Sequence, residues 1–466
     1  MVDYAESSQL NQWMFSTLQE LESCRAQANF KARRFLSESA VKAASSSASA
    51  TETTGTTTNP EPVSNQNISI PVEDFACGWS RRIKSGDEPV FSTDSSSAGP
   101  LESPSGHPYL TPAEEATLVS FYVSKLPSLI GPTAQIPRLR RESKVTATAA
   151  LLLRRFFLSN SVMLYDPKCI MTAAAFLGAK VEDAMTDIRY LEEGTALMNA
   201  PVRQAEILPA ELALLSGIHF DLLCFHPYKA VLALTEDLRT YLKSDKGKAL
   251  VSMDSTASNS SGASSGTRPL SGKDLKPIYD EARNLLDDVV ISDLPLLYSP
   301  GQVGMAALWV AQERVQQQQA AVDTASTTTP ALPPRIDLHG YIKQRFDDSA
   351  SDLFDILPGL CDMLQALQQG QYGCLPKSTT TTTSSDVAAS DAPATATEYM
   401  TTLKAIHKKL KKVRRWGKTT NSGSGGGKKN NKEKDGKGDK KKNKRTEADP
   451  AALHEGGGKR QKTAET

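Results

Sequence analysis

Apolar residues recur three and four positions apart through most of this chain, which is the spacing of an amphipathic helix. No segment shows the clear two-residue alternation that is typical of strands. The segment from Lys144 to Leu158 is apolar on most of its faces, which predicts a central and largely buried helix. The segment from Pro167 to Lys180 is rich in Ala and Gly, so neighbouring helices can approach it closely. The pattern therefore predicts an all-α protein.

The start of one helix is well marked in the sequence. Thr111 offers a capping hydroxyl, Pro112 stands at the first helical position and Glu114 at the third, which together make a capping box. We expect this helix to run to about Leu126, because Pro127 follows directly.

Helices are also predicted near both ends of the chain. Residues 16–19 form another capping box, which starts a helix that should continue to about Ala28. At the other end, residues 398–416 are predicted to form an amphipathic helix whose lysines occupy several of the polar positions. Its apolar stripe consists of Tyr399, Leu403, Ile406, Leu410 and Val413.

Five low-complexity tracts interrupt the helical segments. Such Ser-, Thr- and Ala-rich runs cannot bury enough apolar surface to offset the entropy lost on ordering, so we expect loops, linkers or disordered insertions. The tracts are Ala44 to Asn67, Ser92 to Ser105, Ser255 to Gly266, Gln316 to Pro334 and Ser378 to Thr397.

The chain also contains an internal repeat. A shift of about 133 residues places MLYDPKCIMTAAAFLGAK over LLYSPGQVGMAALWVAQE without a gap. The shared positions include Tyr165 with Tyr298, Pro167 with Pro300 and Ala174 with Ala307. Two copies of one helical unit are therefore expected. The copies differ in surface chemistry, because Lys180 at the end of the first corresponds to Glu313 in the second.

Composition excludes several classes of protein. The formal net charge is +1 over 466 residues, so no global charge excess points to nucleic acid or membrane. No segment approaches the roughly 18 apolar residues of a membrane span, and MVDYAESSQL lacks the features of a signal peptide. The six cysteines form no zinc-ligand spacing and are expected to be reduced thiols in the cytosol or nucleus. They are Cys24, Cys77, Cys169, Cys224, Cys361 and Cys374.

Positive charge is concentrated at the C-terminal end of the sequence. Residues 401–466 hold about 21 Lys and Arg against about 7 Asp and Glu. We interpret residues 417–466 as a disordered basic tail that serves nuclear localisation or weak phosphate contact, or that is simply solvated. It has few aromatic residues to stack on bases, so direct nucleic-acid binding beyond weak contacts of this tail is not expected.

Several of these segments resemble the cyclin family. RRFFLSNSVMLYDPKCIMTAAAFLGAKVED resembles the central part of a cyclin box, and ISDLPLLYSPGQVGMAALWVA resembles the second box of transcription-type cyclins, above all the cyclin H family. SSQLNQWMFSTLQELESCRAQAN is similar to the N-terminal segment of that family, and FHPYKAVLALTEDLRTYL to the start of its second box. The resemblance implies two tandem five-helix cyclin-box repeats with flanking N- and C-terminal helices and disordered insertions.

The domain organisation expected from this resemblance follows the low-complexity tracts. It comprises an N-terminal helix at 1–43, a low-complexity insert at 44–108, a first cyclin box at 109–225, a second box at 226–370 with insertions at 253–270 and 316–334, a linker at 371–397, the amphipathic helix at 398–416 and the basic tail at 417–466.

The resemblance implies a regulatory subunit and not an enzyme. Such a cyclin binds and activates a cyclin-dependent kinase as part of the CDK-activating kinase and the TFIIH kinase module in the nucleus. The implied partners are that kinase, a RING-type assembly subunit and the TFIIH core. The implied outcome is phosphorylation of cell-cycle kinases and of the C-terminal domain of RNA polymerase II. No cofactor, metal site, catalytic residue or membrane contact is expected, and the sequence has no phosphate loop or HExxH motif.

Two alternatives remain open at this stage. The chain could be another transcriptional cyclin, such as cyclin C or the cyclin of the elongation kinase. It could also be a TFIIB-like promoter-binding factor with two cyclin-fold repeats, although such factors begin with a zinc ribbon and this N-terminus has no paired cysteines.

The resemblance also implies two kinase-binding residues. Cyclins carry a lysine at the end of the third helix of the first box and a glutamate in the fifth, which here fall on Lys180 and Glu211. Without the resemblance, the two would be taken as an ordinary helix-end cation and a surface acid. Pro209 lies two residues before Glu211 and predicts a kink or restart of the helix that presents the glutamate.

An apolar docking surface is expected around this pair, because specific interfaces bury a hydrophobic core inside a polar rim. Phe176, Leu177 and Leu215 are the candidates for it, with the alternative that they belong to the core. The second box, with Glu313 in place of the lysine, is expected to be scaffold or a surface for the third subunit.

Overall fold

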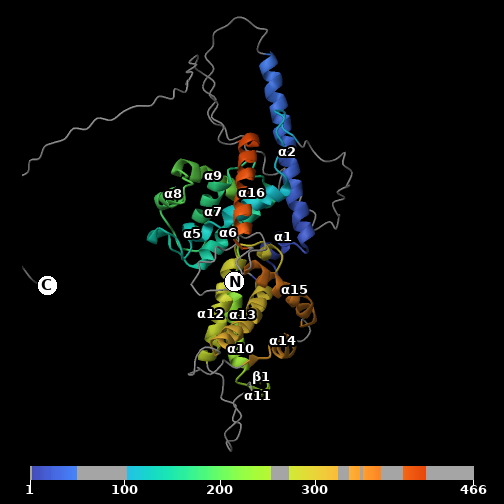
Figure 1. Cartoon of the computed structure of the whole chain (residues 1–466), viewed down its shortest axis with the longest axis vertical. Coiled ribbons are helices and arrows are strands. Elements are labelled where there is room, and N and C mark those ends of the chain that lie inside the picture. The colour runs from blue at the N-terminus through green and yellow to red at the C-terminus, as the bar shows by residue number, and fades with distance from the viewer. Residues whose placement is uncertain are drawn as a thin grey trace, which may run out of the picture. The chain divides into compact units, whose positions relative to one another are not determined.

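The computed structural model describes residues 3–49, 102–252, 272–323, 335–346, 350–368 and 392–415 (Figure 1). Most of the low-complexity tracts, Cys77, Cys374 and the basic tail lie outside the described residues. In the described ranges the protein consists of helices and one very short pair of strands, so the predicted all-α fold is confirmed. None of the described helices is long and apolar enough to cross a membrane.

The first repeat is built around one central helix, α7, which packs against α4, α6, α8 and α9. Its elements are α4 (Pro112–Val123), α5 (Leu126–Ile130), η1 (Pro137–Leu139), α6 (Ser143–Ser159), α7 (Pro167–Val181), α8 (Ile188–Leu197) and α9 (Gln204–Gly217).

The second repeat has the same plan around α13, which packs against α10, α12 and α15. Its helical elements are α10 (Pro227–Tyr241), α11 (Asp245–Lys248), α12 (Gly272–Val289), η2 (Leu294–Leu296), α13 (Pro300–Asp323), α14 (Leu338–Phe346) and α15 (Ala350–Gln368). The strands β1 (Val251–Ser252) and β2 (Arg335–Ile336) pair antiparallel.

The internal repeat found in the sequence is confirmed by these two central helices. Pro167 starts α7 and Pro300 starts α13, and both Ala174 and Ala307 are fully buried. Small residues allow close helix contact: a Cβ on Gly178 would lie 3.0 Å from the backbone nitrogen of Ala149 on α6. The Ala- and Gly-rich segment therefore occupies the middle of the bundle, as its composition predicted.

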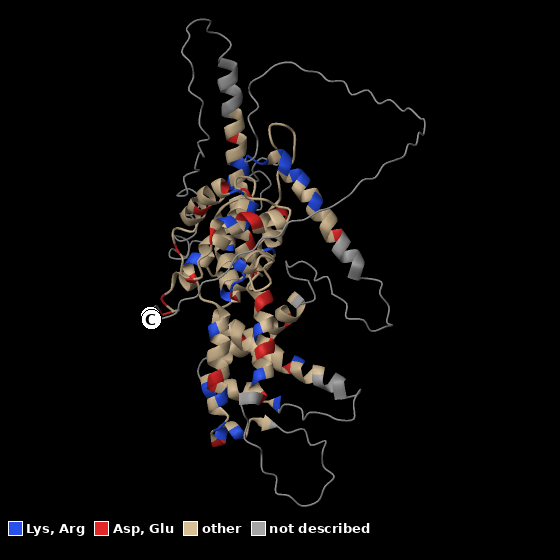
Figure 2. Cartoon of the chain, turned by 90° about the vertical axis from the view of Figure 1, so that its left-hand side faces the viewer, with Lys and Arg blue, Asp and Glu red and all other residues tan. Residues whose placement is uncertain are grey.

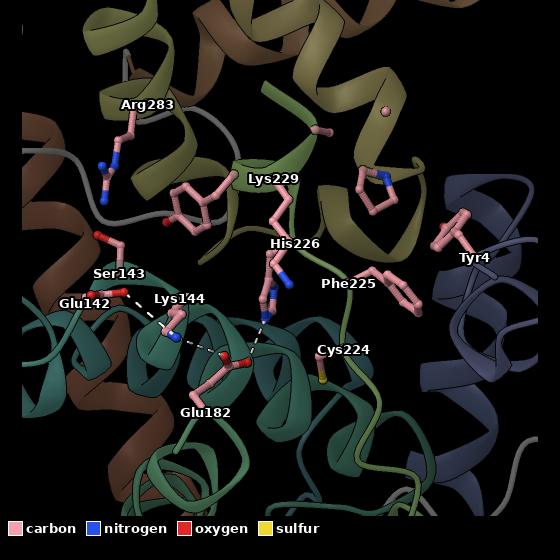
Figure 3. A pocket seen from close by; sticks show the side chains of 14 residues that line it. Tyr4, Glu142, Ser143, Lys144, Glu182, Cys224, Phe225, His226, Lys229 and Arg283 are labelled. Carbon is pink, nitrogen blue, oxygen red and sulfur yellow. Dashed lines mark ion pairs between the residues drawn. The ribbon is translucent and has the colours of Figure 1, made fainter. Parts of the chain in front are cut away.

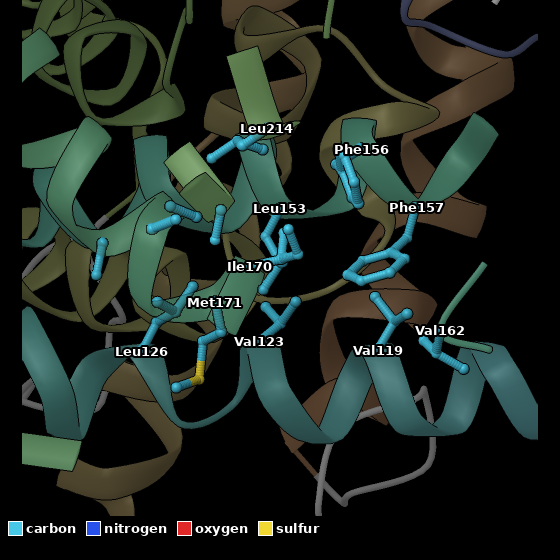
Figure 4. Packing of buried hydrophobic residues seen from close by; sticks show 14 of the residues in the cluster. Val119, Val123, Leu126, Leu153, Phe156, Phe157, Val162, Ile170, Met171 and Leu214 are labelled. Atoms are coloured by element: carbon cyan, nitrogen blue, oxygen red, sulfur yellow. The ribbon is translucent and has the colours of Figure 1, made fainter. Parts of the chain in front are cut away.

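The core of the first repeat is a continuous apolar cluster (Figure 4). Phe156 and Phe157 of α6 meet edge to face with ring centroids 5.1 Å apart. Figure 4 shows them beside Leu153 of the same helix, with Val119 and Val123 of α4 facing them. Burying a large apolar side chain in such a core contributes about 1.5 to 3 kcal/mol relative to leaving it exposed.

Helices at both ends of the chain cover the first repeat. They are α1 (Ser8–Gln12), α2 (Leu18–Ser49) and α16 (Ala392–Val413). The helix α2 packs against α4 and α6, and α16 packs against α4. These contacts explain how two segments that are far apart in sequence lie on one repeat (Figure 1).

The predicted capping box is present at the start of α4. The Thr111 hydroxyl accepts a hydrogen bond from the Glu114 backbone N–H at 3.2 Å, and the Thr111 N–H donates to the Glu114 carboxylate at 2.8 Å. The helix ends earlier than expected, at Val123, and α5 begins at Leu126. Pro127 has no N–H, so it is tolerated in the first turn of α5 but could not continue α4.

Two further expectations were wrong in detail, and one short strand pair was not anticipated. The N-terminal helix, whose stripe was expected to continue to about Ala28 in a segment ending at residue 43, runs to Ser49, and beyond Ala28 it is held by Ala32 and Leu36, which pack into the core of the first repeat. The tract that begins at Gln316 is helical up to Asp323, where α13 ends. The pairing of Val251 with Ile336 adds a strand ladder that is too short to show alternation in the sequence.

Buried arginines join the two repeats. Arg154 of α6 is 3% exposed, pairs with Asp293 and donates to the carbonyl of Ile291 at 2.5 Å. Arg25 of α2 binds the same carboxylate at 2.6 Å. Burial alone would raise the pKa of Asp293, but the charges of Arg154 and Arg25 outweigh it and lower the pKa to about 2. The Asp293 carboxylate of the second repeat thus binds both α2 and α6 through ion pairs.

The N-terminal segment binds the linker between the repeats. The Gln9 side chain accepts from the Phe225 N–H at 2.7 Å and donates to its carbonyl at 3.1 Å. The Trp13 indole N–H donates to the Asp221 carboxylate at 2.6 Å. The buried Arg155 donates to the carbonyl of Leu223 at 3.1 Å. Peptide groups of the linker are therefore satisfied by Gln9 of the N-terminal segment and by Arg155 of α6.

Candidate functional site

Two helices of the first repeat position the predicted ion pair. Asp166 caps the N-terminus of α7 by accepting from the Lys168 N–H at 3.0 Å, and Pro167 follows as the first helical residue. The helix then runs without interruption to Val181, which places Lys180 in its last turn. A cation is favoured there, because the C-terminal end of a helix carries partial negative charge.

Lys180 and Glu211 lie side by side. The Lys180 Nζ is 2.7 Å from the Glu211 Oε1, and it also lies 4.0 Å from the centroid of the Phe176 ring, one helical turn earlier. The Lys180 side chain is 36% exposed and the Glu211 side chain 12%. The ammonium group is thus held between a carboxylate and an aromatic face while part of it still faces solvent.

Pro209 does not restart the helix. One helix, α9, spans Gln204–Gly217 with Pro209 inside it. Its start is reinforced by the Arg203 N–H, which donates to the Glu206 carboxylate at 2.9 Å. Because Pro209 stands close to that start, the helix loses one backbone hydrogen bond but keeps its direction far enough for Glu211 to reach Lys180.

The three apolar candidates occupy different environments. Phe176 and Leu215 are half-buried, so each still presents part of its side chain to solvent. Leu177 is 4% exposed and belongs to the core of the first repeat. Leu177 therefore supports α7 from inside and cannot itself form a contact surface.

The structure adds two leucines that the sequence did not single out. On α9, Leu208 is 55% exposed and Leu212 is 62% exposed, and Leu215 continues the row at helical spacing. The segment ILPAELALL is apolar nearly all round, so its pattern could not tell which leucines face outward. We call Lys180, Glu211, Phe176 and the leucines Leu208, Leu212 and Leu215 the α7–α9 face.

Large apolar side chains that are exposed next to one another are a feature of interaction surfaces. The row runs beside a fixed charge pair, which matches the apolar core and polar rim of specific interfaces. Chemically the α7–α9 face can bind a complementary helix or loop. In the described ranges, no group of three or more His, Cys, Asp or Glu side chains is placed to hold a metal ion.

A cavity of about 410 Å³ lies elsewhere, where the N-terminal segment and the two repeats meet (Figure 3). Glu182 points into it and lies 3.8 Å from Lys144 and 3.7 Å from His226. The hydrogen bond with His226, together with that from Thr148, lowers the pKa of Glu182 despite partial burial. The charges of this cavity largely compensate one another, so it serves as part of the junction and stands apart from the α7–α9 face.

Comparisons with known proteins agree with this architecture. The cyclin C-terminal domain family matches residues 226–368. Cyclin CCL1 of Saccharomyces cerevisiae is 28% identical over 204 residues, which are 44% of this chain and 43% of that protein. Cyclin-H1-1 of Arabidopsis thaliana is 28% identical over 204 residues, which are 43% of this chain and 50% of that protein. The chain thus spans about half the length of these curated relatives or less.

One solved structure supports the fold over most of the chain. It is the CAK complex of Chaetomium thermophilum bound to ATP-γ-S, of which one chain is similar with a TM-score of 0.52 and 21% identity. The similarity covers 88% of this chain and 88% of that chain. At this identity it shows the shared fold. Residues 226–368 therefore form a cyclin C-terminal domain, and the chain is similar in sequence to CCL1 and cyclin-H1-1.

Proposed function

We propose that this chain is a cyclin of the cyclin H and CCL1 group, and that it binds and activates a cyclin-dependent kinase through the α7–α9 face. The observation that carries the proposal is the row of the exposed Leu208 and Leu212 and the half-buried Leu215 beside the fixed pair of Lys180 and Glu211. A rigid apolar surface with one oriented cation fits a helix of a partner whose C-terminal carbonyls need donors.

The physical task of such a face is to bias a two-state element. A kinase is active when the glutamate of its αC helix pairs with its β3 lysine, and a partner that binds only the inward position of αC shifts that equilibrium. Lys180 has three N–H donors, and Glu211 accepts one of them at 2.7 Å. The remaining donors are available to αC carbonyls. The proposal therefore makes the chain a regulatory subunit and assigns catalysis to the kinase.

The wider assignment rests on the relatives. The similarity to CCL1 and cyclin H and the fold shared with a chain of a CAK complex support a place in the CDK-activating kinase and the TFIIH kinase module. On this proposal the partners are a cyclin-dependent kinase, a RING-type assembly subunit and the TFIIH core. The protein would act in the nucleus on cell-cycle kinases and on the C-terminal domain of RNA polymerase II. We assign the first box to residues 109–225 and the second to 226–370.

The direct test is affinity purification of the full chain followed by identification of its partners and a kinase assay. We expect a cyclin-dependent kinase to copurify with the wild-type chain. The double substitution Leu208→Ala/Leu212→Ala should weaken kinase binding by roughly tenfold to a hundredfold, because it removes the apolar centre of the face. A matched control is Leu232→Ala on α10, since Leu232 is 49% exposed but lies in the second repeat.

Two results would contradict the proposal. One is the absence of any cyclin-dependent kinase among the copurified proteins. The other is an equal effect of Leu232→Ala and of the α9 double substitution, which would mean that the α7–α9 face has no special role in binding.

A further inference from the structure

We propose that the outer face of α16 is a binding surface for the phosphate backbone of nucleic acid. The helix is fixed to the first repeat by its apolar side, whose residues are 2% to 5% exposed and belong to the core of that repeat. They are Leu403, Ile406, Leu410 and Val413.

Polar contacts fix the helix further. The Lys409 Nζ lies 2.6 Å from the Glu114 carboxylate of α4. Past the end of α16, the Arg415 N–H donates to the Met163 carbonyl at 3.0 Å, and its guanidinium lies over the Phe35 ring of α2. The orientation of α16 about its own axis is therefore set, and its opposite side is held outward.

That outward side is cationic. Lys404, Lys408, Lys411 and Lys412 are all exposed, and none forms an ion pair with another described residue. Their spacing of four, three and one positions puts them on one side of the helix, opposite the buried stripe. No Asp or Glu follows Glu398 on α16. Figure 2 shows Lys and Arg following one another along this helix.

The chemistry of the face favours nucleic acid over a protein partner. A specific protein interface needs an apolar core, but Met400, near the start of the described side chains of α16, is the only large apolar residue exposed on that helix. Phosphate contacts need cations and no apolar core. From Lys404 to Lys412 the helix rises about 12 Å, a length over which each strand of a duplex presents about three to four phosphate charges. Four lysines on a fixed helix therefore meet a matching density of negative charge.

Base selectivity is not part of the proposal. The face has lysines but no aromatic or amide side chain aimed outward with them, so it can hold a backbone without reading a sequence. The proposal uses no residue of the α7–α9 face, so it stands or falls independently of kinase binding.

The test is the salt dependence of binding between the full chain and a fluorescently labelled duplex DNA of about 20 base pairs, followed by anisotropy between about 50 and 200 mM salt. The variant carries four substitutions that keep helix propensity nearly unchanged. They are Lys404→Gln, Lys408→Gln, Lys411→Gln and Lys412→Gln.

The control variant removes the same charge from the second repeat. Its four lysines are exposed and form no ion pair with another described residue, so both variants should melt at nearly the wild-type temperature. The substitutions are Lys229→Gln, Lys243→Gln, Lys246→Gln and Lys343→Gln.

We expect the α16 variant to bind the duplex at least about tenfold more weakly at the lowest salt. The slope of log affinity against log salt should become shallower by about 3 to 4, close to 0.9 for each phosphate that the variant no longer neutralises. The control variant should keep the wild-type slope, and a duplex of unrelated sequence should bind equally well.

Three outcomes would overturn the proposal. The wild-type chain could fail to bind the duplex, or the two quadruple variants could show the same fall in affinity and slope. A polyglutamate peptide of the same charge could also bind as tightly as the duplex at each salt concentration, which would assign the face to acidic proteins.

Discussion

The two repeats share one fold but present different chemistry at the same place. In the first repeat, Lys180 at the end of α7 pairs with Glu211 of α9. In the second, the equivalent position on α13 is Glu313, and its neighbour on α15 is Cys361. Burial and then the charge of Glu313 raise the pKa of the Cys361 thiol to about 12, so the thiol stays neutral. One repeat thus offers an oriented cation and the other an acid beside a neutral thiol.

The last helices of the two repeats, α9 and α15, have similar buried sides but different exposed sides. When their buried positions are aligned, Ala210, Leu214 and Gly217 of α9 coincide with Leu360, Leu364 and Leu367 of α15. The core sides are therefore alike. The outer sides are not, because α9 exposes Leu208 and Leu212, whereas the described part of α15 exposes acids such as Asp355 and Asp362. Packing preserves the shared core, and only surface residues are free to specialise.

The largest effect is expected when the acid found in the second repeat is introduced at the equivalent position of the first. Lys180→Glu should weaken kinase binding by about 3 to 5 kcal/mol, because a second carboxylate would stand beside the poorly exposed Glu211 and the cation would be removed. Isothermal titration with the purified kinase measures the effect. The reverse substitution in the second repeat, Glu313→Lys, should leave kinase binding unchanged.

A variant in which the two charges are exchanged shows whether Lys180 contacts the kinase directly or only holds α7 and α9 together. Lys180→Glu/Glu211→Lys keeps an internal ion pair but moves the cation to the other helix. If the kinase contacts Lys180 directly, the binding defect should persist in the exchanged variant. Full recovery of binding would show that the pair only holds α7 and α9 together.

A second difference lies inside the repeats. The first helix of the first repeat buries Glu115, which accepts hydrogen bonds from Ser161 and Asn29, whereas the corresponding helix α10 buries no carboxylate. Burial raises the pKa of Glu115 to about 7. A raised carboxyl pKa means that the folded state binds the proton more tightly than the unfolded state. Its contribution to stability is therefore largest below about pH 4.5 and is lost as the pH rises through 7.

Glu115→Gln should remove the loss of stability that the wild type shows as the pH rises through 7. The free energy of unfolding of the variant minus that of the wild type should increase by roughly 3 kcal/mol between about pH 4.5 and 8. Denaturant unfolding at several pH values measures it. Glu193→Gln on α8 is the control, since it removes a carboxylate from an exposed position. The lowered pKa of Asp293 acts below about pH 4 and does not overlap with this window. If the difference in unfolding free energy between Glu115→Gln and the wild type did not change with pH, the raised pKa of Glu115 would be contradicted.

The smallest expected effect concerns how closely helices approach one another in each repeat. A Cβ on Gly217 of α9 would lie 2.4 Å from the buried Phe156 ring, whereas a Cβ on Gly359 of α15 would have nothing within 4 Å. Gly217→Ala should therefore destabilise the protein by about 1 to 3 kcal/mol through overpacking. Gly359→Ala should stabilise it by about 0.5 to 1 kcal/mol, because alanine favours an exposed helix interior. Thermal melting of both variants checks the signs, and two changes of the same sign would be inconsistent with this difference in packing.

The helical fold and the internal repeat could be predicted from the sequence alone. Helical periodicity, the capping box at Thr111 and the two prolines that start α7 and α13 are local signals, and local signals survive without knowledge of the partners. Lys180 and Glu211 were predicted as kinase-binding residues through the resemblance to cyclins, and the repeat alone shows only that the second copy carries Glu313 where the first carries Lys180.

Which side of each apolar segment faces outward depends on tertiary packing and could not be read from the sequence. In α9 it exposes Leu208 and Leu212 and buries Leu214, and in α7 it buries Leu177, although all four are leucines in apolar surroundings. It also fixed the cationic side of α16 by packing the other side on α4, a contact between segments almost 300 positions apart in the sequence. Periodicity states that a helix has two sides, but burial depends on which distant helix arrives to cover one of them.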